Sequence, residues 1–356
     1  MHGTMHLSMR NRLLASVRRA LGTQGLNDRL ATLQSEVDAL QAGLAKQNGA
    51  EAPAGSIQDD LTALRVKMEE MGKYQFLPGT KTSRYAVPLD AAPSRHLRPR
   101  WGNIQPPIAP LLDWMSSGAS AYQDVLDAMR RHAAQFAAID RDFDAARLPQ
   151  PGILGAPLSP FDAAAVYAIV ADKRPKRVIE IGPGVAAAFA KRSIQDQGID
   201  ARITVIDPEP HAGIETACDK LVRRALETTD LSIFDQLEAG DVVLLESTHR
   251  AFTNSDVTVF MIDVLPRLKP GVVIAMSEVH LPWDYPDRFN DRYWNEAYIL
   301  AAYLIGARER VEPILPTAWI TRGAQFASWF ETPLIDLGDA NGQWRSGSAL
   351  WFTHRA

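Results

Sequence analysis

The chain has 356 residues, enough for one large or two ordinary domains, and its 46% hydrophobic and 22% charged residues are typical of a globular protein. The net charge of -4 gives no overall attraction for nucleic acid, so we expect no such partner. Cys218 is the single cysteine, which excludes an internal disulfide and favours a reducing, cytoplasmic location, and no apolar run reaches the roughly 18 residues of a membrane span.

Residues 1–25 form a basic amphipathic segment. They contain arginines but no acid, and their leucines fall at helical spacing. Arg18 and Arg19 interrupt the apolar stretch that a signal peptide would need. Contact with an anionic membrane surface is one interpretation. We favour the other, a helix that is solvated or packed on a partner.

Residues 26–72 carry two apolar seams spaced by four and three residues. Their members are Leu26, Leu30, Leu33, Val37, Leu40 and Leu44, then, after the break NGAEAPAG, Ile57, Leu61, Leu64, Met68 and Met71. Such seams are typical of a coiled coil, and one helix alone cannot bury them. We therefore predict self-association through residues 26–72. A hairpin folded back at the break and a helix lying on the main domain are the alternatives.

Residues 73–118 predict an irregular linker, because seven prolines preclude a long helix there. The main domain is expected over residues 119–356. It opens with a helical lead-in over residues 119–143, which has one apolar stripe. A second helix is expected to begin after Ser159, with this serine as the cap and Pro160 in the first turn.

Residues 177–207 predict a buried strand, a glycine turn, a helix and a second strand that ends on an acid. Gly182 and Gly184 let the backbone turn sharply and approach a ligand. Asp207, at the carboxyl end of the second strand, could accept hydrogen bonds from both hydroxyls of a ribose. A ligand that contains a nucleoside is therefore our hypothesis, and an ordinary strand–helix turn is the plain alternative.

Two cofactors are compatible with this turn. Gly182, Gly184 and Ala187 satisfy the looser Gly-x-Gly-x-x-Ala form of the dinucleotide fingerprint, which predicts NAD. Glu180, two residues before the first glycine, instead matches the Glu-x-Gly-x-Gly turn of class I methyltransferases that use S-adenosylmethionine (SAM), which the stretch resembles. Ala187 lies in an alanine run and so carries little information, and we favour SAM.

Beyond Asp207, helices and strands alternate. Helices are expected at residues 214–226, 255–268 and 293–306, and strands at residues 241–245, 272–276 and 348–353. This alternation predicts an α/β fold with a Rossmann-like, doubly wound, mostly parallel sheet, whose ligands bind at the carboxyl ends of the strands. Acids and histidines gather at these ends: Glu180, Asp207, Glu246, His249, Glu278 and His280. Singly, each could be a loop or capping residue; as a set they predict an active site.

Residues 240–304 are similar to one subgroup of the class I SAM-dependent methyltransferases, and the similarity extends over residues 97–353. The subgroup's Asp-Ser-Ser-His and His-Asp-Ile-Phe motifs correspond to the segments that begin at Glu246 and Ser277, and its Asn-Ser-Asp-Val and Leu-Pro-Arg-Leu-x-Pro-Gly motifs are kept. The resemblance implies methyl transfer from SAM to a small acceptor, such as a hydroxyl of a sugar or of a glycan-pathway intermediate.

The resemblance also implies catalytic roles. His249 is expected to be the base, because the ordinary pKa of histidine is close to neutral pH. Glu278 would orient that imidazole or act as the base itself. Glu246 and Glu278 could alternatively hold Mg²⁺, which we do not favour, because only two carboxylates are evident. Nearby aromatic residues could line the acceptor pocket or belong to the core: Trp283, Tyr285, Tyr293 and Trp294.

The cofactor is expected to contact Glu180, Gly182, Gly184 and Asp207, with Asp207 on the ribose and Asp230 near the adenine edge. Two other functions stay open. The first is an NAD-dependent oxidoreductase. The second is a catalytically degenerate methyltransferase fold that serves as a scaffold and oligomerises through residues 26–72.

Overall fold

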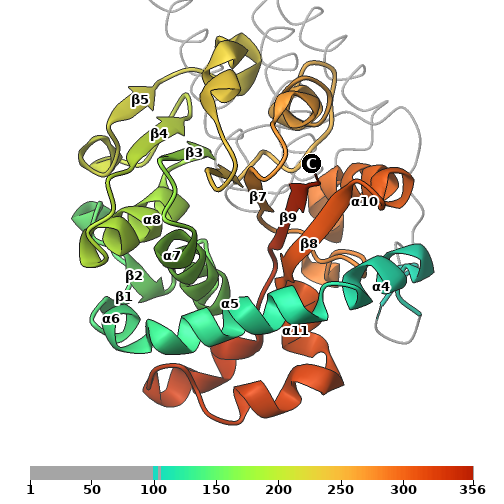
Figure 1. Ribbon diagram of the computed structural model, residues 1–356, viewed down its shortest axis with the longest axis horizontal. Helices are drawn as coiled ribbons and strands as arrows, with labels where there is room; N and C mark the ends of the chain where they lie inside the picture. The colour runs from blue at the N-terminus through green and yellow to red at the C-terminus, as the bar shows by residue number, and fades with distance from the viewer. Residues whose placement is uncertain (1–98, 103–105, 356) are drawn as a thin grey trace, which may run out of the picture. The chain divides into compact units, whose positions relative to one another are not determined.

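The computed structural model describes residues 99–102 and 106–355, with side chains omitted at a few of these positions (Figure 1). The basic segment 1–25 and the coiled coil 26–72 lie outside the described residues and stay predictions. A compact unit begins at Arg98, ahead of the domain start predicted at residue 119.

The predicted linker contains a helix, α4 (Ala109–Ser116), so the prediction of irregular structure over residues 73–118 is wrong there. Pro110 stands in the first turn of α4, where its missing N–H costs no hydrogen bond. Trp114 is buried, and its indole nitrogen donates to the Val311 carbonyl at 2.8 Å. The helix is therefore packed into the domain.

The remaining elements include most of the predicted alternating helices and strands. The other α-helices are α5 (Ala119–Arg131), α6 (Ala133–Ala137), α7 (Pro160–Lys173), α8 (Val185–Asp196), α9 (Asp256–Val259), α10 (Glu296–Ala307) and α11 (Thr317–Arg322). The strands are β1 (Asp140–Asp142), β2 (Gly152–Leu154), β3 (Arg177–Ile181), β4 (Arg202–Ile206), β5 (Lys220–Val222), β6 (Val242–Leu245), β7 (Val273–Met276), β8 (Val311–Pro316) and β9 (Leu350–His354). Among the described residues, no helix combines the length and the apolar composition needed to cross a membrane.

The central sheet has seven strands in the order β5-β4-β3-β6-β7-β9-β8. The pairs from β5 to β7 are all parallel, whereas β9 runs antiparallel to both of its neighbours. The short strands β1 and β2 pair separately. The predicted α/β class and mostly parallel sheet are confirmed.

Both faces of the sheet are covered, as side-chain alternation along β6 illustrates. Val242 and Leu244 face one hydrophobic core, and Val243 and Leu245 face the other. The first core includes residues of α5, α7 and α8, and the second includes residues of α4, α9 and α10 (Figure 1). Continuous apolar runs in the sequence therefore correspond to strands buried on both sides.

The start of α7 confirms the predicted cap. The Ser159 hydroxyl accepts a hydrogen bond from the Asp162 amide at 3.1 Å, and Pro160 occupies the first turn. The Asp162 carboxylate in turn accepts from the Ser348 amide at 2.9 Å, which fixes the approach to β9 beside α7.

Two predicted helices differ in the structure, and strands β1, β2, β5 and β8 were not predicted. Residues 214–226 do not form a helix: β5 lies there, because pairing with β4 outweighs the weak local helical pattern. The helix predicted over 255–268 is α9 followed by a π-turn (Phe260–Val264) and a 3-10 turn (Leu265–Arg267). Strand β8 was not predicted, because Pro313 and Pro316 conceal it; proline is tolerated there since β8 is an edge strand.

The remaining turns are 3-10 helices: Ala145–Arg147, Ile214–Thr216, Leu226–Thr228, Leu231–Gln236, Asp287–Arg292, Ala324–Phe330 and Gly338–Arg345. The chain order reverses between β3 and β6, since β4 and β5 lie on one side of β3 and β6 and β7 on the other. Open α/β sheets bind ligands at the carboxyl ends of the strands at such a reversal. The predicted site residues follow these strand ends.

Candidate active site

The turn between β3 and α8 requires glycine at two positions. Gly182 has φ +145° and Gly184 has φ +103°. A Cβ on Gly182 would lie 2.7 Å from the Cβ of Glu246, and one on Gly184 would lie 2.1 Å from Cγ1 of Ile214. Gly182 packs closely against the residue that follows β6, and Gly184 packs closely against the loop after β4. Neither position therefore has room for a side chain.

The side chain of Glu180 stabilises this turn through hydrogen bonds to its backbone amides. Its side chain is 1% exposed, and its carboxylate accepts hydrogen bonds from the amides of Gly184, at 3.0 Å, and Ala187. Burial raises the pKa of Glu180 to about 8, against the lowering effect of the two amides, and the nearby charge of Glu246 also raises it. The carboxyl group thus occupies the N-terminus of α8, the position at which a helix attracts an anion.

Asp207 directly follows β4, the strand next to β3. It is half-buried, and one carboxylate oxygen accepts the Glu209 amide at 2.7 Å. Burial raises the pKa of Asp207. Its place at a carboxyl strand end beside the glycine turn is the one predicted for a ribose contact.

Asp230 lies in a different setting. It is exposed and caps the 3-10 helix Leu231–Gln236, where its carboxylate accepts the Ser232 amide at 3.0 Å. This contact is a local cap rather than a link to another predicted site residue. The adenine contact of Asp230 stays a prediction.

His249 is held by a carboxylate that the sequence did not identify. Its Nδ1 is hydrogen-bonded to Oε1 of Glu296, which is 1% exposed at the start of α10. The Ser247 hydroxyl donates to the other oxygen of Glu296 and accepts the His249 amide at 2.9 Å. Glu296 and Ser247 therefore hold His249 in place.

Two further contacts hold the loop that carries His249. Asp256, in the first turn of α9, accepts the Thr248 amide and hydroxyl, each at 2.7 Å. The backbone amide of Asn295 donates to the His249 carbonyl at 2.9 Å, and the side-chain oxygen of Asn295 accepts the Ala251 amide at 2.7 Å. These bonds support the left-handed conformation of His249, whose φ is +62°.

The other face of the imidazole meets Glu246 and Trp294. Nε2 of His249 lies 3.7 Å from Oε1 of Glu246, and the Trp294 ring centre is 4.1 Å away. Burial lowers the pKa of His249, but Glu296 and Glu246 more than offset this and raise it to about 10. At neutral pH the imidazole is therefore protonated, so it cannot accept a second proton as the predicted base would.

The charge of His249 makes stability depend on pH. Because its folded pKa of about 10 exceeds the ordinary 6.5, the stabilisation is complete below pH 6.5 and is lost as the pH rises through 10. We expect the free energy of unfolding to fall by about 1.4 kcal/mol per pH unit between these limits from this group. Urea unfolding at several pH values, compared with His249→Gln, measures the slope. Parallel curves for the two proteins would contradict a protonated His249.

Glu278 and His280 form a second acid–imidazole pair after β7. Oε2 of Glu278 lies 3.7 Å from Nε2 of His280, and Nδ1 of His280 lies 3.2 Å from a terminal nitrogen of Arg322. The Ser277 amide donates to the Leu245 carbonyl at 2.9 Å, so Glu246 and Glu278 follow adjacent strand ends. Glu278 contacts His280, whereas Glu296 orients His249, the role predicted for Glu278.

Among residues 99–102 and 106–355, no group of three or more histidine, cysteine or acidic side chains is arranged to hold a metal ion. The magnesium alternative therefore still rests on Glu246 and Glu278, each of which lies beside a histidine.

Glu296 is the main site residue that sequence reasoning missed. A signal was present, because the acid opens a helix, EAYILAAYLIGA, that otherwise has no charged residue. A buried carboxylate on such a helix requires a partner. The aromatic residues predicted to line an acceptor pocket or to belong to the core have different positions. Trp283 and Tyr285 line a cavity, whereas Trp294 packs on His249 and stacks on Phe289, with a distance of 4.5 Å between the ring centres.

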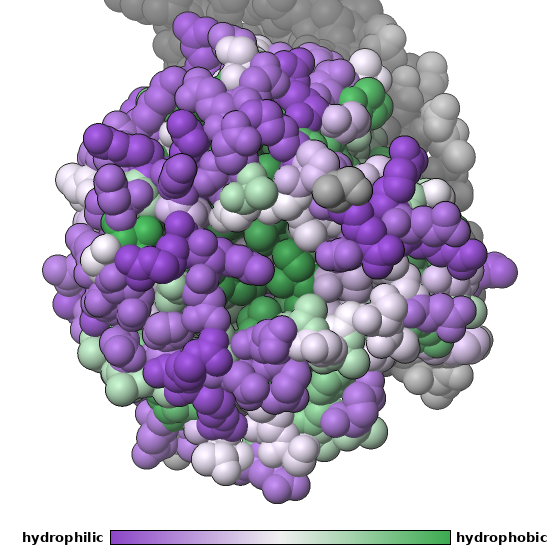
Figure 2. All heavy atoms as spheres, in the orientation of Figure 1, coloured by the Kyte–Doolittle hydropathy of each residue, from purple (hydrophilic) through white to green (hydrophobic). Residues whose placement is uncertain are grey.

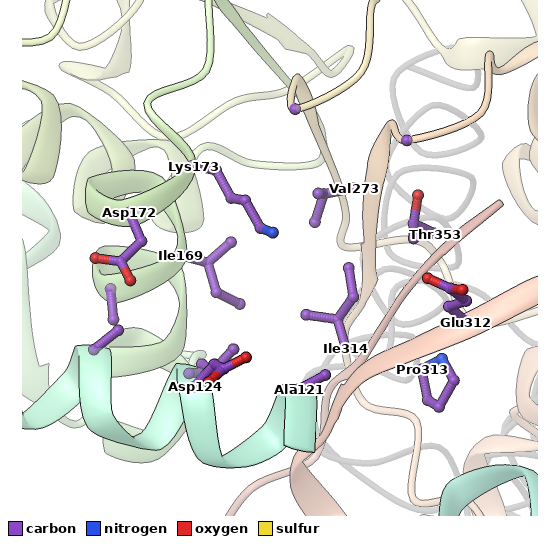
Figure 3. Close-up of a pocket in the computed structure, with 15 residues that line it drawn as sticks. Ala121, Asp124, Ile169, Asp172, Lys173, Val273, Glu312, Pro313, Ile314 and Thr353 are labelled. Carbon is purple, nitrogen blue, oxygen red and sulfur yellow. The ribbon is translucent and has the colours of Figure 1, made fainter. Parts of the chain in front are cut away.

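Two cavities are relevant to the position of the site. One, of about 400 Å³, is lined by Pro99, Trp101, Gly102, residues 283–286 and Arg322, and Arg322 contacts His280. The other, of about 440 Å³, includes Gly240 and Gly271, which precede β6 and β7, and so lies at the opposite edge of the sheet. Figure 2 shows an apolar hollow on this face, and Figure 3 shows Ile169 and Ile314 facing each other in the cavity, with Lys173 nearby. Of the two, the first cavity is connected to the strand-end residues, through the contact between Arg322 and His280.

No protein-family model matches the sequence, and no curated protein matches it. Among solved structures, the chain is similar to the Podospora anserina methyltransferase PaMTH1 with bound S-adenosylhomocysteine (SAH), at 20% identity, covering 61% of this chain and 95% of that chain, with a TM-score of 0.33. The O-methyltransferase TomG from Streptomyces achromogenes, in complex with SAM, is 19% identical over 54% of this chain and 80% of that chain, with a TM-score of 0.33. CmcI with Mg and SAM is 16% identical over 61% and 86%, with a TM-score of 0.31. Similarity at these identities and TM-scores does not establish a function. The function is therefore inferred from the residue contacts within this chain.

Proposed function

We propose that the protein is a SAM-dependent methyltransferase that transfers a methyl group to a hydroxyl of a small acceptor. The observation that carries this proposal is the place of Glu180, whose carboxyl group binds the amides of Gly184 and Ala187 at the start of α8. A dinucleotide would need this helix N-terminus for its pyrophosphate. A cofactor without phosphate, such as SAM, has no such need.

The charge of the strand ends supports the same choice. Asp207, Glu246 and Glu278 follow three strands of the parallel part of the sheet, β4, β6 and β7. A negative crevice attracts the sulfonium and ammonium groups of SAM and repels a pyrophosphate. The NAD-dependent alternative is disfavoured on both grounds.

The sheet order also distinguishes the two families. The usual dinucleotide-binding order is 3-2-1-4-5-6, with parallel strands. Here β9 is inserted antiparallel between β7 and β8, which departs from that order.

The residues present fit SAM. The glycine turn at Gly182 and Gly184 would lie along it, and Asp207 would accept its ribose hydroxyls. When bound, this cofactor supplies a methyl group on a sulfonium, a good leaving group. The chain must place the acceptor hydroxyl in line and remove its proton.

We assign proton removal to Glu246. It is the partly exposed member of the Glu246–His249–Glu296 series, whereas His249 already carries a proton at neutral pH. His249 would orient Glu246 through the 3.7 Å ion pair, and Glu296 would hold His249. In this arrangement His249 and Glu296 are positioning residues.

A labelling assay tests this function. The full-length protein is incubated with methyl-labelled SAM and the low-molecular-weight fraction of a cell extract, and labelled products are separated. We expect a labelled small molecule that wild-type protein forms and Glu246→Gln does not. SAH binding without label transfer to any fraction would instead support the degenerate scaffold.

Self-association through residues 26–72 is part of the proposal. Deleting residues 1–75 should convert an oligomer to a monomer in sedimentation and leave SAH affinity unchanged, because the compact unit begins at Arg98. A wild-type monomer would contradict the coiled-coil prediction.

A further inference from the structure

The cavity of about 400 Å³ that Arg322 lines, called the slot below, has aromatic walls. Trp101 and Trp283 line it together with Tyr285, and its volume of about 400 Å³ suits a ring with a few substituents. The Trp101 amide donates to Asp284 Oδ2, and the Asp284 amide donates to the Trp101 carbonyl, both at 2.8 Å. A Cβ on Gly102 would lie 3.2 Å from Trp283, so the two segments are closely packed.

The cavity contains one acid, Asp284, and its charge is already engaged. The side chain is 9% exposed and holds the Trp101 amide. It also contacts Tyr298: burial, and then the charge of Asp284, raise the pKa of the Tyr298 hydroxyl. Asp284 therefore fixes the wall of the slot.

Two arginines stack on the tryptophans of the slot. The guanidinium carbon of Arg322 lies 5.0 Å from the Trp283 ring centre, and that of Arg100 lies 5.6 Å from the Trp101 ring centre. Both arginines are exposed, and Arg322 lines the cavity. A guanidinium stacked on an aromatic face keeps its N–H groups in the plane of its fork, the geometry that matches a carboxylate.

The cavity is linked to the candidate active site at two points. Arg322 contacts His280, which in turn lies beside Glu278 at the end of β7. The Tyr285 hydroxyl accepts the amide of Ala297, the residue after Glu296, the partner of His249. A molecule in the slot that contacts Arg322 would therefore be connected through His280 to Glu278, the carboxylate that follows β7.

We propose that this slot is the acceptor subsite and that it selects a ring compound bearing a carboxylate, with the ring against Trp101 and Trp283 and the carboxylate at Arg322. This inference rests on the proposed methyltransferase function, and it specifies the acceptor as a carboxylic acid that also carries the hydroxyl to be methylated. The negative strand ends would repel such an anion, so Arg322 supplies the compensating charge.

The test measures binding rather than turnover. The full chain is saturated with SAH and titrated with 4-hydroxybenzoate and with its uncharged counterpart, 4-hydroxybenzamide. We expect the acid to bind about tenfold more tightly, the discrimination that a charge-assisted hydrogen bond provides. Arg322→Gln should bind the two probes within about twofold of each other, and Arg322→Lys should keep part of the preference, because lysine keeps the charge but not the fork.

Arg345→Gln is the matched control, because Arg345 also stacks on an aromatic ring, Phe330, away from the slot. It should retain the full preference. Equal affinity for the two probes in wild-type protein, no binding of either at millimolar concentration, or unchanged preference in Arg322→Gln would overturn the carboxylate assignment. Since SAH binding is measured first, its absence would count against the proposed function, whereas SAH binding without probe discrimination would count against the slot alone.

Discussion

Replacing Glu246 by glutamine should lower kcat by about 10²–10⁴-fold, the contribution of a general base, with SAH affinity changed by less than about threefold. Glutamine keeps the size of the side chain, so the packing of Gly182 against Glu246 is preserved. What is lost is the proton acceptor and the charge that faces Nε2 of His249. The measurement is the rate of methyl-label transfer at saturating SAM.

Two further variants make this result specific. Glu238→Gln is the matched control. Glu238 is an exposed glutamate on the loop before β6 and pairs with Lys269, so the rate of methyl transfer by this variant should be unchanged. Glu296→Gln should lower kcat less than Glu246→Gln, since it acts through His249. Full activity in Glu246→Gln would show that another group removes the proton.

Replacing Asp207 by alanine should weaken SAH binding by about 100-fold. The half-buried carboxylate at the end of β4 is expected to accept both ribose hydroxyls, and charge-assisted hydrogen bonds contribute about 1.5–3 kcal/mol each. Burial raises the pKa of Asp207, against the lowering effect of the Glu209 amide. Calorimetric titration with SAH gives the change in affinity directly.

The control for this loss is Asp235→Ala. Asp235 is an exposed aspartate paired with Arg267, so its removal should leave SAH affinity and stability almost unchanged. Asp207→Asn should fall between wild type and Asp207→Ala, because an amide oxygen still accepts one hydroxyl. An Asp207→Ala protein that binds SAH as wild type does would remove Asp207 from the cofactor site.

The central sheet could be predicted because its strands are buried on both faces and so form uninterrupted apolar runs, as at β6 and β7. Strand β5 was missed because three residues, Lys220–Val222, pair with β4 through tertiary contacts that the local pattern does not express. Strand β8 was missed because proline signals a loop unless the strand is known to lie at an edge.

The candidate site could be predicted only in part, for a similar reason. Residues that directly follow strands, such as Asp207 and Glu246, can be located once the parallel sheet is inferred. Glu296 is 47 positions from His249, so neither their hydrogen bond nor the protonated state of the imidazole is visible in the spacing. Arg322 likewise contacts His280 from 42 positions away.

The cofactor is the central claim, and calorimetric titration of the full-length protein with SAH, with NADH titrated in parallel, tests it most directly. We predict micromolar binding of SAH and no heat from NADH, because the Glu180 carboxyl group fills the N-terminus of α8 that a pyrophosphate would need. Binding of NADH but not of SAH would contradict the methyltransferase assignment and favour a nicotinamide-dependent enzyme.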